Sequence, residues 1–214
     1  MRAALTLLLA VFLAAPFLAA KDPPPQIRPQ PAATYPAKDG HDDVIVAVVP
    51  YDTEEKSKAV FGKYDPLKAG VLPVYLVISN NSKDVVRLDK WTVELIAADR
   101  QRAEPTPAGT VSLMLRGKKM PRSMDPPRGP LPRLPERYNT DDEAALLSRE
   151  FALKMVPPGD TVGGFLFFDT GRRTHVVRGA KLYLTHITWG STGKEMLYFE
   201  IKLEDALKVK LPTP

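Results

Sequence analysis

The stretch VLPVYLVIS at residues 71–79 carries the strongest strand signal in the chain. A run of apolar, largely β-branched side chains is typical of a strand, and the Asn80-Asn81-Ser82 sequence behind it is typical of a turn. Pro73 has no backbone N–H group to donate to a neighbouring strand. We therefore expect the beginning of this strand to lie at the edge of its sheet.

Further segments with strand patterns lie on both sides of this run. They are Val44–Val49, Val85–Leu88, Trp91–Leu95, Thr110–Leu115, Phe151–Met155, Thr161–Phe168, Ala180–Trp189 and Met196–Leu203. The first is short and β-branched, which suits a strand buried on both faces. Gly163 and Gly164 suggest a bulge or a close backbone contact.

The last two segments predict a hairpin joined through Gly190-Ser191-Thr192-Gly193. On its second arm Leu197, Phe199, Ile201 and Leu203 alternate with Tyr198, Glu200 and Lys202, so the two sets face opposite ways.

Two short helices interrupt the predicted strands. Asp52, with Glu55 three positions on, is the expected cap of the first helix, and Gly62 stands where a helix ends in a left-handed residue. Thr140 and Glu143 predict a capping box for a second helix through Leu147.

From these candidate segments we expect seven or eight short strands with only two helical insertions, which indicates an all-β fold, a sandwich of two antiparallel sheets. The stretch Val71–Ser82 and the stretch Pro157–Asp169, a Pro-Pro-Gly turn before Gly-Phe-Leu-Phe-Phe-Asp, resemble exported bacterial immunoglobulin-like domains of uncharacterised function. The resemblance spans roughly residues 44–203 and implies an immunoglobulin-like β-sandwich. Its motifs mark strand ends and turns, so it implies no site.

The first twenty residues have the pattern of a secretory signal peptide. Arg2 is followed by an uncharged run from Ala3 to Leu18, and the small residues Ala19 and Ala20 predict cleavage after position 20. A retained membrane anchor is the alternative. The chain has no cysteine, so attachment of a lipid to a cysteine after this run is excluded. We expect an exported protein, periplasmic or extracellular, without a transmembrane span after cleavage.

The remaining chain divides by composition. Residues 21–40 contain six prolines and predict an extended tether. Residues 41–207 are the expected β-sandwich domain, with residues 115–139 as a loop insertion, and residues 208–214 are the expected tail.

Catalytic patterns are weak, and we expect a noncatalytic protein without a cofactor or a metal. The absence of cysteine excludes thiol nucleophiles and thiolate metal sites. His41-Asp42-Asp43 could begin a metal site, but no second ligand pair stands at a recognisable spacing. His186 is in phase with Leu182 and Leu184 on a predicted sheet face, and His175 lies in a turn.

The loop at residues 115–139 holds the basic surplus of the chain. It contains six prolines and has a net charge of +5, whereas the net charge of the whole chain after Ala20 is +4. Its basic residues, the hypothetical partner-binding set, are Arg116, Lys118, Lys119, Arg122, Arg128, Arg133 and Arg137. Long loops inside domains tend to be functional or disordered. Arginine predominates, which favours phosphate or carboxylate contacts; the alternative is a solvated insertion.

An anionic envelope surface or an acidic protein is therefore the expected partner, and nucleic acid is not, because only Tyr138 could stack on a base. The aromatic residues of the second half are expected to fill the core between the sheets: Phe165, Phe167, Phe168, Tyr183, Trp189, Tyr198 and Phe199. If some of these rings face outward, the sheet could bind carbohydrate or a partner strand.

The sequence thus favours a noncatalytic binding or assembly module of the cell envelope. Two alternatives remain open: an envelope hydrolase or metal-dependent enzyme with its site on the sandwich loops, and a structural subunit that joins its neighbour by edge-strand addition.

Overall fold

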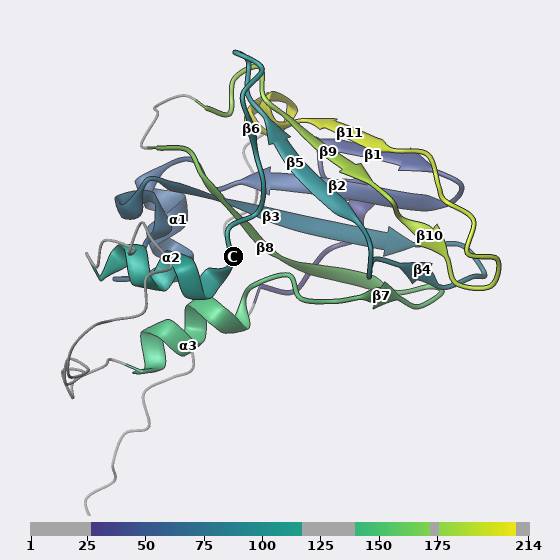
Figure 1. Ribbon diagram of the computed structural model, residues 1–214, viewed down its shortest axis with the longest axis horizontal. Coiled ribbons are helices and arrows are strands. Elements are labelled where there is room, and N and C mark those ends of the chain that lie inside the picture. Colours follow the sequence, from purple (N-terminus) through teal and green to yellow (C-terminus); the bar gives the residue numbers. More distant parts are fainter. Residues whose placement is uncertain (1–26, 117–139, 172–175, 209–214) are drawn as a thin grey trace, which may run out of the picture.

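The computed structural model describes residues 27–116, 140–171 and 176–208, and this part of the chain is mostly β-structure (Figure 1). Within these ranges eleven strands form three antiparallel sheets. Sheet A has the order β1 (Lys38–His41), β2 (Val44–Pro50), β3 (Val71–Asn80) and β8 (Thr161–Asp169). Sheet B has the order β10 (Thr188–Trp189), β4 (Val86–Arg87) and β7 (Met155–Val156). Sheet C has the order β11 (Phe199–Lys202), β9 (Lys181–Thr185), β5 (Thr92–Ile96) and β6 (Arg102–Ala103). The expectation of an all-β, antiparallel protein is confirmed.

An inner core lies between sheets A and C. Successive strand residues point to opposite faces, so Leu72, Val74, Leu76 and Ile78 of β3 all point inward. They pack in one apolar cluster with the inward-facing side chains of sheet C, which are Val93, Leu95, Leu182, Leu184, Phe199 and Ile201. Sheets A and C therefore pack face to face.

A second core covers the outer face of sheet A. Three helices contribute to it, α1 (Glu54–Phe61), α2 (Ala108–Leu115) and α3 (Thr140–Ser148), and they gather at one end of the sheets (Figure 1). Tyr75 and Val77 of β3 and Phe165 and Phe167 of β8 pack against apolar side chains from these helices and from residues near position 32. All ten residues of β3 are buried as a result.

The predicted strand at Thr110–Leu115 is wrong, because this segment belongs to helix α2. Ala108 and Val111 are buried one helical turn apart, and Leu115 packs partly buried on the same core. This spacing is the helical one, and Leu and Met have high helix propensity. The described residues thus hold three α-helices where two short insertions were predicted.

Residues 27–40 pack on the domain, contrary to the predicted tether. Ala32, in the 3-10 helix η1 (Ala32–Thr34), is fully buried, and its N–H donates to Ser79 Oγ at 2.8 Å. Strand β1 pairs with β2 in full register. Residues 1–26, with the predicted signal peptide and the first part of the tether, lie outside the described residues, as do residues 209–214. Residues 203–208 form a 3-10 helix, η3 (Leu203–Lys208).

Helix α1 forms where the sequence predicts it but has a different cap. Thr53 is the N-cap, and its side chain accepts a hydrogen bond from the N–H of Lys56. Asp52 instead accepts a hydrogen bond from Lys56 Nζ at 3.0 Å. Gly62 ends the helix with a positive φ of 57°, but its ψ of −120° lies outside the left-handed conformation that the sequence predicted. The helix at Thr140–Ser148 is also confirmed.

Strand β2 pairs with β3 only as far as Val74, which lies opposite Pro50, so Val71–Pro73 pair with β8 alone and the edge predicted at the beginning of this strand is confirmed. The carbonyl of Pro73 accepts a hydrogen bond from the N–H of Tyr51 at 2.9 Å. In an antiparallel pair the N–H and C=O of one residue point to the same neighbour. The side of Pro73 that lacks an N–H group therefore faces Tyr51, which lies one residue past the end of β2. No hydrogen bond between β2 and β3 is lost there.

The alternation predicted at Phe151–Met155 is also wrong, because only Met155 and Val156 form a strand there. Phe151 is buried against the ring of Trp91, at 5.3 Å between centroids, whereas Leu153 and Met155 are exposed. The N–H of Phe151 donates to the carbonyl of Phe165 at 2.9 Å. This segment thus covers the free edge of β8 instead of forming a half-buried strand.

Both arms of the C-terminal hairpin change their alternation part-way along, where the first arm passes from β9 in sheet C to β10 in sheet B. Inward-facing residues on the first arm pass from Leu184 to Ile187, and His186 between them has a φ of 58°. On the second arm they pass from Met196 to Phe199, so Leu197, predicted to face inward, is 64% exposed. Each arm therefore has one residue too many for strict alternation.

Asn80 joins three loops at the end of the sandwich opposite the helices. Its side-chain Nδ2 donates to the carbonyls of Asp84 at 2.7 Å and Val156 at 3.0 Å, and its Oδ1 accepts from the N–H of Ser82. Its own carbonyl accepts from the N–H of Gly159. The predicted turn at residues 80–82 is confirmed, and Asn80 is fully buried. No helix among the described residues has the length and apolarity needed to cross a bilayer.

Candidate functional site

The helices of the outer core carry the two ends of the predicted basic loop. Arg116 follows the last residue of α2, and its backbone N–H caps that helix on the carbonyl of Ser112. Lys118, Lys119, Arg122, Arg128, Arg133 and Arg137 lie outside the described residues. Helices α2 and α3 contact each other (Figure 1). The chain therefore leaves and re-enters the described domain on one side of sheet A.

Contacts of Arg149 and Glu150, the two residues after α3, connect this helix to α1 and α2. The Arg149 guanidinium lies over the ring of Phe61 in α1, with 5.7 Å from Cζ to the ring centroid. Burial lowers the pKa of Arg149. Glu150 Oε1 accepts a hydrogen bond from the N–H of Ala108, the first residue of α2, at 3.1 Å. A carboxylate at this position also suits the positive end of the helix dipole.

Asp65 is a fully buried carboxylate beneath the same helices. Its Oδ1 accepts hydrogen bonds from Ser57 Oγ of α1 and from the N–H of Leu67 in the 3-10 helix η2 (Pro66–Ala69). Its Oδ2 has no hydrogen-bond partner among the described residues. Asp65 thus ties α1 to η2.

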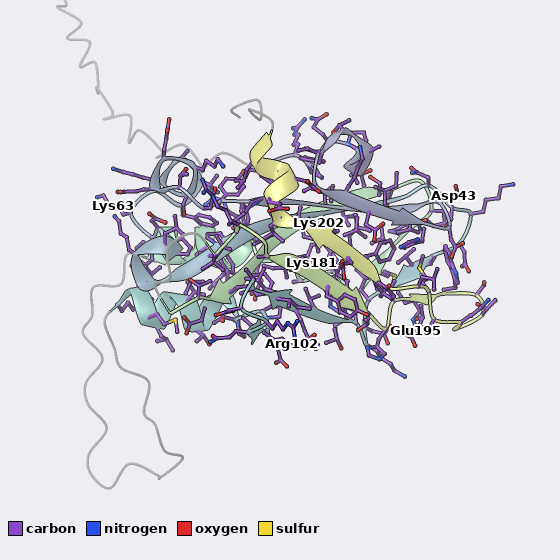
Figure 2. The ribbon with its side chains drawn as sticks, turned by 90° about the horizontal axis from the view of Figure 1, so that it is seen from above. Asp43, Lys63, Arg102, Lys181, Glu195 and Lys202 are labelled. Carbon is purple, nitrogen blue, oxygen red and sulfur yellow. The ribbon has the colours of Figure 1, made fainter. Side chains whose placement is uncertain are left out.

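Asp42 and Asp43 form the turn between β1 and β2, and His41 is the last residue of β1. Asp42 and Asp43 have φ angles of 51° and 64°, the left-handed backbone of a tight hairpin turn. His41 Nε2 lies 3.3 Å from Asp39 Oδ2, and its ring contacts that of Phe199 at 5.1 Å. Across residues 27–116, 140–171 and 176–208, no group of three or more His, Asp or Glu side chains could hold a metal ion. Figure 2 shows Asp43 at the opposite end of the molecule from Lys63.

The sequence predicted His186 on the same sheet face as Leu182 and Leu184. This prediction is wrong. His186 is exposed, at the point where the strand leaves sheet C. Its Nδ1 lies 3.0 Å from Thr185 Oγ1 and 3.3 Å from Thr92 Oγ1. It lies where the chain passes from β9 in sheet C to β10 in sheet B. His175 lies outside the described residues.

The aromatic residues of the second half divide among three places. Phe168 and Phe199 fill the inner core, as predicted, and Trp189 packs at its margin. Phe165 and Phe167 face the other way, into the outer core under the helices. Tyr183 and Tyr198 lie on the solvent side of sheet C, so for these four the predicted inter-sheet position is wrong.

Two further tyrosines are held in the outer core. The rings of Tyr51 and Tyr75 each lie 5.0 Å from that of Phe165. Burial, with the nearby Tyr35 as a second cause, raises the pKa of Tyr51 to about 12 and raises the pKa of Tyr75 further. Gly163 lies under Tyr75, and a Cβ on it would stand 2.5 Å from the phenol oxygen. The predicted close contact at this glycine pair is confirmed.

The outer face of sheet C carries side chains of three kinds in parallel rows. Register places Glu200, Tyr183 and Glu94 side by side across β11, β9 and β5. The neighbouring row crosses all four strands and consists of Lys202, Lys181, Ile96 and Arg102. Figure 2 shows its labelled members Lys202, Lys181 and Arg102 following one another across the sheet.

Ion pairs join the two rows. Lys181 Nζ donates to Glu200 Oε1 at 2.6 Å, and Arg102 Nη1 donates to Glu94 Oε2 at 2.9 Å. These pairs are exposed, so each contributes little to stability, but each holds its two side chains in place beside Tyr183. Tyr198, which is 52% exposed, contacts the ring of Tyr183 at 5.1 Å between centroids.

We define the tyrosine face as Tyr183 and Tyr198 with the pairs Lys181–Glu200 and Arg102–Glu94. Sequence reasoning expected both tyrosines in the core and left outward-facing rings as the alternative. The alternation of Leu182 and Leu184 with Lys181, Tyr183 and Thr185 could have placed Tyr183 outside. Comparisons of the chain with protein-family models, with characterised proteins and with solved structures find no match.

Proposed function

We propose that this chain is a noncatalytic, exported binding or assembly module of the cell envelope. In this proposal an immunoglobulin-like sandwich presents residues 115–139 to an anionic surface or an acidic partner. The observation that carries it is the concentration of the basic surplus, +5, in a segment whose two ends lie together on α2 and α3.

The order of the strands supports the immunoglobulin-like part of the proposal. In immunoglobulin-type sandwiches the first, second and fifth strands adjoin in one sheet, and the seventh, sixth and third adjoin in the other. When β2 is counted as the first strand and the short strands of sheet B are left out, β3 is the second strand and β8 the fifth, so sheet A has the first arrangement. Sheet C has β11, β9 and β5 in the second, and β6 extends it as the additional strand of variable-type domains does.

The composition of the segment supports an anionic partner. Its seven basic residues include five arginines, whose planar guanidinium groups pair with phosphate or carboxylate in a bidentate way. Six prolines keep these groups off any single helical face, so they suit a broad charged surface better than a groove. Such attraction weakens as salt screens the charges.

Vesicle binding tests this function. We expect the purified protein to sediment with vesicles of anionic phospholipid and to be released by added salt, whereas deletion of residues 118–137 abolishes binding. Replacement of Arg122, Arg128, Arg133 and Arg137 by Gln should weaken binding at least tenfold.

A charge-matched control separates the loop from net charge. Lys83, Lys90, Lys194 and Lys202 are exposed on the described domain. Their replacement by Gln removes the same four charges and should leave binding within about twofold of the wild type. Equal losses in both variants, or unchanged binding by the deletion variant, would contradict the proposal.

A further inference from the structure

The tyrosine face is a second surface with the composition of a binding site, and it does not depend on residues 115–139. Tyr198 is 52% exposed, and Tyr183 lies half-buried beside it. We propose that the tyrosine face binds a neutral, linear polysaccharide.

The rings offer a place for the apolar side of a sugar. A tyrosine ring provides a rigid apolar surface with a polar tip, and it loses little conformational entropy on binding. Tyr183 is further held by its ring contact with Tyr198. A sugar residue that covers these rings would bury C–H groups while its hydroxyl groups stay at the margin.

Charged groups fixed around the rings can receive those hydroxyl groups. Glu200 and Glu94 flank Tyr183 on the two neighbouring strands and are each held by one cation at 2.6 and 2.9 Å. An ionised carboxylate retains further acceptor sites when one is occupied, and lysine and arginine retain further donors. Hydrogen bonds to charged groups are stronger than neutral ones, so these groups would orient a polyhydroxyl ligand.

The electrostatics of the face favour an uncharged ligand. Each carboxylate beside Tyr183 already has its own cation, so the two charges cancel within a few ångströms. A strongly charged polymer would have to break these pairs to gain its own, whereas a neutral hydroxyl-rich chain can add to them. The tyrosine face therefore favours an uncharged ligand, whereas the basic segment favours an anionic one.

The geometry of the rings favours a chain over a flat ligand. The two ring planes meet at 39°, so one flat aromatic molecule cannot stack on both. Neighbouring residues of a linear polysaccharide are themselves rotated relative to one another and can follow this angle. Tyr183 lies in β9 and Tyr198 directly precedes the adjacent strand β11, and the spacing of about 5 Å between neighbouring strands matches the length of about one sugar residue.

Affinity gel electrophoresis tests the proposal. The full-length processed protein would be run through native gels that contain a soluble β-glucan, a galactomannan or, for contrast, the acidic polymer polygalacturonate. We expect retardation by at least one neutral polymer and not by the acidic one. Tyr198→Ala should weaken the retardation at least fivefold, and Tyr198→Phe, which keeps the ring, should retain most of it.

Three controls make the outcome decisive. Tyr64→Ala removes a tyrosine outside the face and should migrate as the wild type does. Deletion of residues 118–137 should leave retardation unchanged, so this proposal and the proposed function can fail separately. Absence of retardation by both neutral polymers, retardation that survives Tyr198→Ala, or a dimer that Tyr198→Ala dissociates in sedimentation would each overturn the proposal.

Discussion

Gly164 lies directly against the backbone of Phe151: a Cβ added to the glycine would stand 2.7 Å from the Phe151 Cα. This approach lets residues 149–151 pair with the outer edge of β8, where the N–H of Phe165 donates to the carbonyl of Arg149 at 2.7 Å. The edge of sheet A is thereby closed by the segment that follows α3.

Replacement of Gly164 by Ala should therefore destabilise the protein. The obstacle is backbone, which cannot turn aside as a side chain can, and we expect a loss of about 1–3 kcal/mol in the free energy of unfolding. Urea denaturation would measure it. Gly109→Ala is the matched control: nothing lies within 4 Å of its Cβ, and in helix α2 it should add about 0.5–1 kcal/mol. Equal effects of the two substitutions would refute this assignment of the close contact.

Asn80→Asp should be strongly destabilising at neutral pH. The substitution replaces an amide that donates to two carbonyls by a carboxylate that can only accept, so two buried carbonyls would face a negative charge. We expect a loss of about 3 kcal/mol, measured by thermal and urea unfolding. The neighbouring Asn81 is exposed, and Asn81→Asp, which adds the same charge, should change stability by less than about 0.5 kcal/mol.

Thr53→Ala should cost about 1 kcal/mol, because it removes the side-chain oxygen that caps helix α1. Asp52→Ala removes only a partly exposed ion pair with Lys56 and should cost about 0.3–0.5 kcal/mol. Chemical denaturation of the two variants distinguishes the observed cap from the one that the sequence suggested. A larger loss for Asp52→Ala would count against Thr53.

Alkaline pH should destabilise the fold through its buried phenols. The pKa of Tyr51 is raised from 10.0 to about 12 by burial, so the folded state keeps the proton that the unfolded chain releases. The contribution of the protonated Tyr51 phenol to the free energy of unfolding is thus complete below pH 10 and is lost as pH rises toward 12. Urea unfolding across this interval should show a smaller decline for Tyr51→Phe than for the wild type. Identical pH slopes would contradict the burial of this hydroxyl.

The antiparallel β-fold could be predicted from the sequence because its central strands are continuous apolar runs. Val71–Asn80 and Val44–Pro50 have patterns that local chemistry alone specifies. Helix α2 could not be recognised in this way, since Thr-Val-Ser-Leu-Met-Leu satisfies both a strand and a helix over so short a length. Only the packing of Ala108 and Val111 on sheet A selects the helix.

The outer core was the main omission of sequence reasoning. Its N-terminal part comes from a proline-rich stretch whose buried residue in this core, Ala32, is too small to give an apolar signal. The outward-facing tyrosines were only the alternative for a different reason: an aromatic residue in a strand is usually buried, and the register that turns Tyr183 outward depends on pairing with β5 and β11. The basic segment remains a prediction from composition.

Strand β3 is the common wall of both cores, since one set of its side chains enters the sandwich and the other set supports the helices. The helices cannot unfold without exposing the outer apolar face of sheet A, and sheet C cannot unfold without exposing the inner face of sheet A. The protein should consequently lose its structure as one cooperative unit, with a single calorimetric transition, and fragments that retain only the helices or only the two sheets should not fold.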